Sequence, residues 1–426
     1  MQVPPLFRSI RDRYHQAYSG LPKEVWLISI TLLISRCGTM VLPFIAIYFK
    51  DELAFKPFTI GILLAVYGAG SVIGTLCGGW LTNVIGPLRV QVLSLALSIP
   101  AFLMLGWANS FWTVVWAMFY LSIVAESIRP ASATATTQFC KKEQHPQGLA
   151  LNRLAVNLGM AIGPAVGGYL AEINYQLLFY VNACGAAFSG AAFICFFGFW
   201  PRRIRTSESS EQTNAGTGVA SSPWTNRLFM RFILLNFFTA IVFFQLLSTY
   251  GVYLNDIYLL SESKIGMLLV VNTVLIVLLE MVLIDYVKRF HLTKTLACGV
   301  FLTCLGFGLM PFGVPLLGMS SGNWLLLSFC VLTIVIWTFG EMLHAPLSAT
   351  FVASCSQDSN RGTYMGVYGS CFSLALVVCP LLTMTLYNWN PNWIGYFSLL
   401  AAPILFLGFW KLETPSQVPT RKAQHS

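Results

Sequence analysis

The chain has 426 residues, of which 56% are hydrophobic and 10% are charged, and its mean hydropathy is +0.70. One soluble core cannot bury so much apolar surface, so the composition predicts a membrane protein and excludes an ordinary soluble domain. The formal net charge of +9 would suit nucleic acid, but Lys and Arg gather between apolar runs, so we expect no nucleic-acid partner.

Twelve apolar runs follow one another along the chain. Roughly 20 helical residues cross about 30 Å of hydrocarbon, and each run is close to that length or longer. In chain order, the expected spans are 26–49, 58–83, 89–107, 111–136, 148–172, 176–200, 228–252, 264–286, 294–313, 324–353, 362–386 and 393–412. The sequence therefore predicts an all-α polytopic membrane protein with 12 transmembrane helices.

The positive charges favour one side of these spans. With a cytoplasmic N-terminus, nineteen Lys and Arg residues fall in inside segments, and only Lys50, Lys56 and Lys264 fall outside. Lys and Arg accumulate in cytoplasmic loops of membrane proteins. We therefore expect a multi-pass protein of the cell (inner) membrane with both termini cytoplasmic.

The two halves of the chain resemble each other at polar, Gly and Pro positions. An offset of 205 relates Tyr48, Asp51, Ile60 and Gly61 to Tyr253, Asp256, Ile265 and Gly266. An offset of 216 relates Pro130, Pro164, Asn174 and Tyr180 to Pro346, Pro380, Asn390 and Tyr396. This internal repeat predicts two pseudo-symmetric six-helix bundles.

A polar stretch of low complexity, from Arg202 to Pro223, lies near the middle of the chain and is typical of a flexible linker. It sets the expected divisions of the chain. These are a cytoplasmic N-terminal segment at 1–24, an N-terminal bundle at 25–200, a cytoplasmic linker at 201–227, a C-terminal bundle at 228–412 and a cytoplasmic tail at 413–426.

Four polar residues of the first bundle are candidates for handling substrate or protons. An ionisable residue within a span costs roughly 2.5 to 3.5 kcal/mol unless it is paired or hydrated. Glu126 and Arg129 share a face of the fourth span, Asn157 is expected at similar depth in the fifth, and Arg36 lies in the first. We expect the Glu126 charge to be shared between an Arg partner and substrate. The alternative is a static ion pair that holds helices together.

The second bundle carries its own candidates. Glu341 and His344 lie three apart in the tenth span and could carry protons, because His titrates near neutrality. The alternative is a packing or hinge role beside Pro346. Glu280 and Asp285 lie near the cytoplasmic end of the eighth span, where we expect them to pair at a gate.

The fifth span contains a string of small residues. Gly159, Gly163 and Gly167 lie four apart, so they share one helix face and allow a neighbouring backbone to approach closely, while Pro164 loosens the helix. With Gly168, this GxxxGPxxGG string resembles the antiporter motif of drug:proton antiporters in the major facilitator superfamily.

Other stretches resemble the same superfamily. They are the first span from Arg36 to Phe44, the fourth around Glu126, the tenth from Gly340 to Pro346, and the loop after the tenth at 361–366. The loop after the second span has Asn83, Gly86 and Arg89 where the family has an acidic residue, a glycine and an Arg pair, so its gate motif is depleted. The resemblance implies a cavity lined by the first and fourth helices, which would bring Arg36 to Glu126.

These features predict a secondary active transporter, with proton-coupled export of small amphipathic or drug-like compounds by alternating access. The alternative is proton-linked transport of a charged nutrient such as a peptide, an organic anion or a siderophore, held by Arg36 and Arg129. No nucleophile with a base, phosphate loop or metal-ligand cluster indicates an enzyme. We expect a monomer whose partners are a small-molecule substrate, protons and the lipid bilayer, with no cofactor and no metal.

Overall fold

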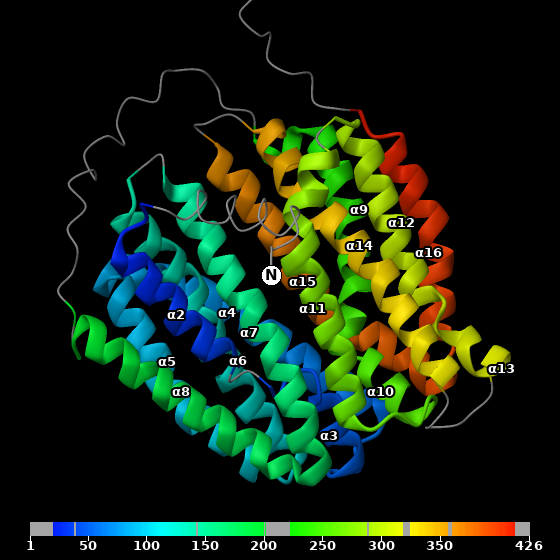
Figure 1. The fold of residues 1–426 in the computed structure, drawn as a ribbon, viewed down its shortest axis with the longest axis horizontal. Coiled ribbons are helices and arrows are strands. Elements are labelled where there is room, and N and C mark those ends of the chain that lie inside the picture. Colours follow the sequence, from blue (N-terminus) through cyan, green and yellow to red (C-terminus); the bar gives the residue numbers. More distant parts are fainter. Residues whose placement is uncertain are drawn as a thin grey trace, which may run out of the picture. The chain divides into compact units, whose positions relative to one another are not determined.

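The computed structural model describes residues 20–37, 40–141, 144–199, 201, 222–287, 289–317, 324–356 and 360–413. Helices joined by turns and short loops are the regular elements of these residues (Figure 1). The all-α prediction is therefore confirmed. Most of the expected linker at 201–227, and most of the two terminal segments, fall outside the described residues.

The helices follow one another with short connections. In the first half they are α2 (Lys23–Cys37), α3 (Ile45–Asp51), α4 (Pro57–Ile85), α5 (Pro87–Trp107), α6 (Phe111–Phe139), α7 (His145–Ile173) and α8 (Tyr175–Phe197). In the second half they are η2 (Pro223–Thr225), α9 (Arg227–Phe244), η3 (Gln245–Leu247), α10 (Tyr250–Asp256), α11 (Glu262–Val287), α12 (Leu292–Gly308), η4 (Met310–Phe312), α13 (Gly313–Leu317), α14 (Trp324–Cys355), α15 (Arg361–Trp389) and α16 (Trp393–Trp410).

The first expected span, 26–49, is two helices rather than one. α2 ends at Cys37, α3 begins at Ile45, and a turn occupies residues 42–44. Pro43 has no backbone N–H to donate, and its ring clashes with the preceding turn of a straight helix. The prediction of one continuous helix is wrong here, and eleven of the described helices are long and apolar enough to cross a membrane.

The broken first helix recurs in the second half. α3 and α10 are both seven residues long and are related by the offset of 205 found in the sequence. Each ends in the same way, because Phe55 N–H donates to Phe49 O at 2.9 Å and Leu260 N–H donates to Leu254 O at 3.1 Å. This closure joins an N–H to the carbonyl oxygen six residues earlier, just after one residue in the left-handed region. Its occurrence at equivalent positions supports the internal repeat.

The structure also agrees with the second sequence offset, 216, which relates Asn174 to Asn390. Asn174 and Asn390 follow α7 and α15 with extended backbones, at φ −168° and −159°, and each donates its N–H back to the preceding turn. Each Asn side chain also accepts the N–H two residues later, at 2.7 and 2.9 Å. Repeat-related residues therefore make the same turn in both halves.

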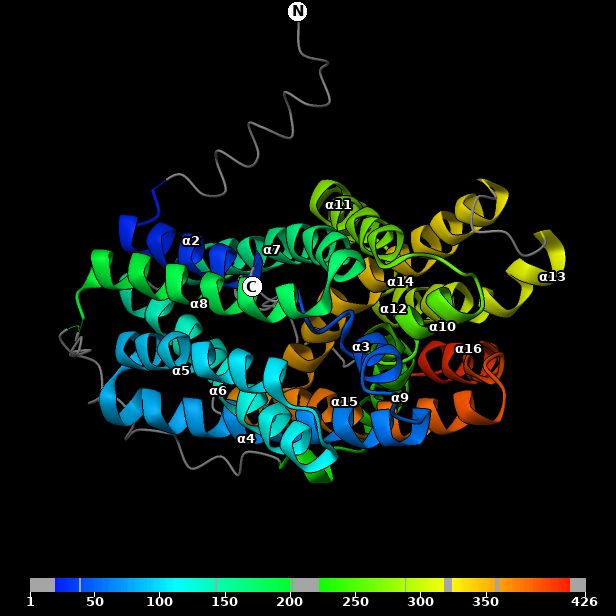
Figure 2. The same cartoon turned by 90° about the horizontal axis from the view of Figure 1, so that it is seen from below.

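The helices group into two compact units. The first contains Met1–Leu42 and Gly70–Ser209, and the second contains Pro43–Ala69 and Ser210–Ser426. In the first unit α2 packs on α7 and α8, and α5 packs on α6 and α8 (Figure 2). In the second unit α12 packs on α14 and α16, α9 packs on α15, and α3 packs on α10. The second unit thus includes Pro43–Ala69, a segment that lies within the expected N-terminal bundle. The expected division of the chain into bundles at 25–200 and 228–412 stays a prediction.

Glycines of α4 explain the placement of that segment. A Cβ atom at Gly61 or Gly68 would come within 2.8 Å of the Pro380 or Leu376 carbonyl oxygen, respectively, of α15. Later in the helix, three glycines instead contact α6, at Gly70, Gly74 and Gly78. Because each contact leaves no room for a side chain, the first part of α4 packs closely within the second unit and the later part within the first.

The two helix closures contain residues other than glycine in the left-handed region, Ala54 at φ 53° and Leu259 at φ 54°. A Cβ atom is unfavourable in this conformation. We therefore expect Ala54→Gly to stabilise the protein by about 0.5–1 kcal/mol, seen as a higher midpoint of thermal unfolding in detergent. Ala191→Gly in the exposed middle of α8 is the control and should destabilise by roughly 1 kcal/mol. A lower midpoint for Ala54→Gly would contradict the assigned backbone.

Candidate functional site

The glycine face of α7 meets α2 at Arg36. A Cβ atom at Gly159 would lie 2.5 Å from Arg36 Cβ and 3.0 Å from the Arg36 carbonyl carbon. A Cβ atom at Gly163 would lie 3.4 Å from the Arg36 and Cys37 carbonyl oxygens, which is ordinary contact. Pro164 lies inside α7, and Gly167 and Gly168 are buried. The tight contact at Gly159 therefore fixes the position of the Arg36 Cβ atom, from which the side chain extends.

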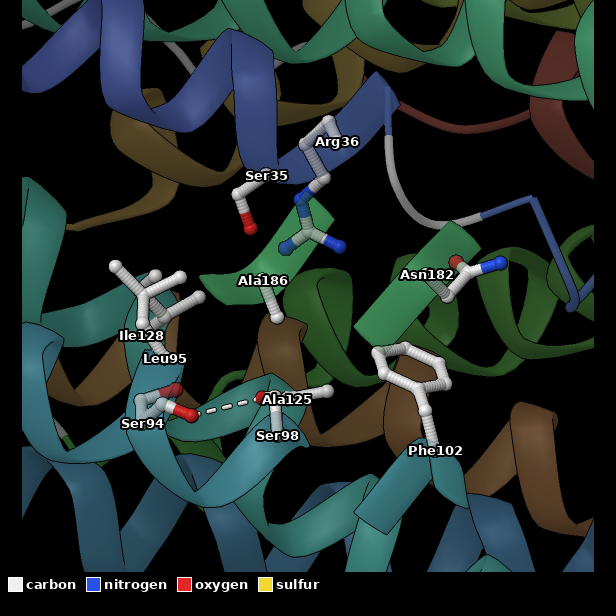
Figure 3. A pocket seen from close by; sticks show the side chains of 10 residues that line it. All are labelled: Ser35, Arg36, Ser94, Leu95, Ser98, Phe102, Ala125, Ile128, Asn182 and Ala186. Carbon is white, nitrogen blue, oxygen red and sulfur yellow. Dashed lines mark hydrogen bonds between the residues drawn. The ribbon is translucent and has the colours of Figure 1, made fainter. Parts of the chain in front are cut away.

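Arg36 faces a small cavity inside the first unit (Figure 3). The cavity has a volume of about 30 Å³ and is lined by Ser35, Arg36, Ser94, Leu95, Ser98, Phe102, Ala125, Ile128, Asn182 and Ala186. Two serine hydroxyls in it are committed to backbone carbonyls, because Ser94 donates to Val124 O at 2.7 Å and Ser98 donates to Ser94 O at 2.8 Å. Their lone pairs remain as acceptors opposite the guanidinium donors. This polarity and volume suit about two water molecules.

Glu126 forms an ion pair on its own helix. Arg129 Nε donates to Glu126 Oε2 at 2.9 Å near the middle of α6. Only 8% of the Glu126 side chain is exposed, against 66% of the Arg129 side chain. A buried carboxylate is thus bound to a cation that remains largely accessible. Such an arrangement lets a change around the cation alter the environment of the carboxylate.

The expected neighbours of this pair are Arg36 and Asn157. Arg36 contacts the cavity that Ala125 and Ile128 of α6 line, and Glu126 is not among the lining residues. Asn157 is half-buried on α7. Their predicted meeting with Glu126 therefore stays a prediction.

Glu341 has a partner that the sequence did not reveal. Asn272 Nδ2 of α11 donates to Glu341 Oε2 at 3.2 Å and to Thr338 Oγ1 at 3.0 Å, both on α14. Both hydrogens of one amide group can therefore be used between two helices. An Asn in the middle of the apolar run of α11 was the available signal, because a polar residue there requires a hydrogen-bond partner.

His344 lies in a packed environment. Its side chain is buried, Nε2 is 3.2 Å from Ser348 Oγ on the same helix, and its ring meets Phe409 of α16 edge-on at 5.6 Å. Both contacts suit a packing residue of the second unit. A proton-carrying role for His344 stays a prediction.

The expected gate residues lie at helix ends. Gly86 caps α5 with φ 95°, a conformation that favours glycine, and Arg89 Nε donates to Pro201 O at 3.0 Å, just after α8. Asn83 is exposed and Glu280 is half-buried. Asp285 lies in α11, but its side chain is outside the described residues. Arg89 thus contacts the start of the linker segment, a role that its loop position did not indicate.

A second charged cluster lies in the second unit. Lys50 of α3 pairs with Asp256 of α10, and Tyr387 Oη of α15 donates to Asp256 Oδ2 at 2.6 Å. The repeat had related Asp51 to Asp256, but a sequence offset does not indicate contact between the helices. Among the described residues, no group of three or more His, Cys, Asp or Glu side chains could hold a metal ion.

Comparison with known proteins identifies the family. The sequence profile of the Major Facilitator Superfamily matches residues 27–340 and 233–426, so the chain belongs to this superfamily. It is accordingly a multi-pass secondary transporter of small molecules and not an enzyme.

Two curated relatives extend over most of the chain. A "Na(+), Li(+), K(+)/H(+) antiporter" of Planococcus maritimus is 24% identical over 407 residues, covering 87% of this chain and 91% of the relative. A "Tetracycline resistance protein, class B" of Escherichia coli is 23% identical over 383 residues, covering 87% of this chain and 90% of the relative.

Solved structures show the same fold. A POT family transporter in complex with 5-aminolevulinic acid superposes with a TM-score of 0.75 at 14% identity, covering 92% of this chain and 96% of the other. The nucleoside transporter NupG gives a TM-score of 0.75 at 12% identity, covering 91% and 99%. These likenesses confirm the predicted major facilitator fold of about twelve membrane-spanning helices.

The glycine contacts predict a graded series of variants. Gly159→Ala should lower the midpoint of thermal unfolding by several degrees, because a methyl group 2.5 Å from Arg36 Cβ overpacks the contact between α7 and α2, at a cost of roughly 1–3 kcal/mol. Gly163→Ala should have a small effect. Gly79→Ala, where no atom lies within 4 Å of an added Cβ, is the matched control. Equal midpoints for all three variants would contradict the assigned packing of α2 on α7.

Proposed function

We propose that this transporter exports small amphipathic or drug-like compounds in exchange for protons, by alternating access. The observation that carries the proposal is the pair on α6, a carboxylate with 8% of its side chain exposed bound to a guanidinium with 66% exposed. A carboxylate within a membrane span is unfavourable unless it is paired or protonated. A cationic substrate that approaches this pair would therefore lower the proton affinity of Glu126, which is the coupling that an antiporter requires.

The second unit supplies another carboxylate for the same task. Glu341 lies on α14 and accepts a hydrogen bond from Asn272. That hydrogen bond links the Glu341 carboxylate of α14 to α11. A proton reaching Glu341 would weaken this link between α11 and α14. We therefore place Glu126 and Glu341 as the two proton sites.

The relatives and the motif support antiport. The relatives include a cation/proton antiporter and a tetracycline resistance protein, each covering 87% of this chain. The glycine face of α7, which resembles an antiporter motif in sequence, packs directly against α2 at Arg36. The excess of Lys and Arg in the expected inside segments supports a cytoplasmic position of both termini, and we further propose a monomer in the cell (inner) membrane.

Flux through the purified protein in proteoliposomes tests this proposal. A pH gradient should accelerate the movement of a fluorescent amphipathic cation in the wild type, and Glu126→Gln and Glu341→Gln should each reduce that acceleration about tenfold or more, because neither amide binds a proton at this site. Glu172→Gln, at an exposed position near the end of α7, is the control and should keep full acceleration. Flux that is indifferent to the gradient, or full coupling in both variants, would refute proton exchange.

The exposure of Arg129 also favours a second candidate function. An accessible guanidinium in a span is a binding group for carboxylate or phosphate. A charged nutrient such as a peptide, an organic anion or a siderophore would be anchored by Arg129, and Arg36 would supply a second positive charge.

Binding measurements separate the two candidates. If the substrate is anionic, Arg129→Gln should weaken binding of a small organic anion about tenfold or more, since a charge-assisted hydrogen bond contributes roughly 1.5–3 kcal/mol. Arg153→Gln, at an exposed position on α7, should leave that affinity unchanged. Isothermal titration calorimetry in detergent gives both affinities. A wild-type protein that binds a lipophilic cation and no anion would reject this second function.

A further inference from the structure

The charged cluster of the second unit contains one cation between two carboxylates. Lys50 Nζ pairs with Asp256 Oδ1 of α10 and also lies 3.3 Å from Asp51 Oδ1 of its own helix, α3. The three side chains are partly shielded, with exposed fractions of 29% for Lys50, 21% for Asp256 and 38% for Asp51. Tyr387 donates to the other oxygen of Asp256. Lys50 therefore has two acceptors, one on each of two helices.

The internal repeat makes this arrangement asymmetric. Asp51 and Asp256 occupy equivalent positions at the ends of α3 and α10, but the equivalent of Lys50 is Asn255. Asn255 donates its amide to Leu260 O at 3.2 Å, within its own turn. The repeat thus presents two equivalent carboxylates to a single ammonium group, and the two carboxylates compete for it.

We propose that Lys50 is a switch residue of the transport cycle, which pairs with Asp256 when α3 and α10 are together and with Asp51 alone when they separate. This proposal rests on the alternating-access part of the proposed function. In the separated state Lys50 keeps its neighbour Asp51, and Asp256 keeps the Tyr387 hydroxyl. No charge of the cluster loses every partner, so the helices part without the full cost of an unpaired ion.

The two carboxylates therefore have opposite effects on the same equilibrium. Asp256 stabilises the joined state, because its bond to Lys50 exists only there. Asp51 favours the separated state, because its charge repels Asp256 when the helices are together. Partly exposed ion pairs are modest interactions, so each carboxylate should change the ratio of the two states about two- to fivefold.

Single-molecule energy transfer measures this ratio in the full-length protein. Fluorophores introduced through unnatural amino acids at Glu52 and Leu259, both exposed, leave the eleven native cysteines in place. Asp256→Asn and Lys50→Met should each raise the ratio of distant to close fluorophores about two- to fivefold, whereas Asp51→Asn should lower it by a similar factor. Tyr387→Phe should act in the direction of Asp256→Asn, with a smaller effect.

The double variant Lys50→Asp with Asp256→Lys separates loss of pairing from misfolding, because it reverses the pair and should restore the joined population. If Asp51→Asn acts in the same direction as Asp256→Asn, or if the double variant resembles the single ones, Lys50 is not a switch. The distances are measured without substrate or a pH gradient. A transporter that proves not to exchange protons can therefore still show the switch, and the two failures are distinguishable.

Discussion

A charge held away from water must keep a partner, and much of this structure follows from that constraint. A charged residue at the centre of a span costs roughly 2.5 to 3.5 kcal/mol on insertion. Glu126 meets the requirement within one helix through Arg129, whereas Glu341 meets it across two helices through Asn272. A local pair survives any movement of its helix. A pair across helices constrains how those helices can move.

Glycine contacts decide which helices can meet closely. In a bilayer the lipid is as apolar as a leucine side chain, so helices associate through close packing more than through burial of apolar surface. Gly159 lets α7 contact α2 closely at Arg36. In the same way, Gly61 and Gly68 let α4 pack closely on α15. The resemblance of the α7 string to an antiporter motif thus has a physical counterpart, because it positions a charged side chain of the first helix.

The sequence was most informative where the signal is local or repeated. Hydropathy predicted the spans, and the spacing of Glu126 and Arg129 predicted a shared face. The repeat related Asn174 to Asn390, and the structure shows that these two residues make the same turn. It did not predict the break between α2 and α3, because Pro43 in an apolar run is compatible with a kinked as well as an interrupted helix. The partners of Glu341 and Lys50 lie 69 and 206 positions away, and no local pattern fixes such contacts.

The central claim is that substrate and proton compete through the α6 pair. Proton release on binding, measured with purified protein in weakly buffered detergent solution, tests it most directly. Addition of tetraphenylphosphonium, a lipophilic cation, should release protons in proportion to the ligand bound, and the release should disappear in Glu126→Gln. Saturable binding with no proton release near neutral pH would contradict the account.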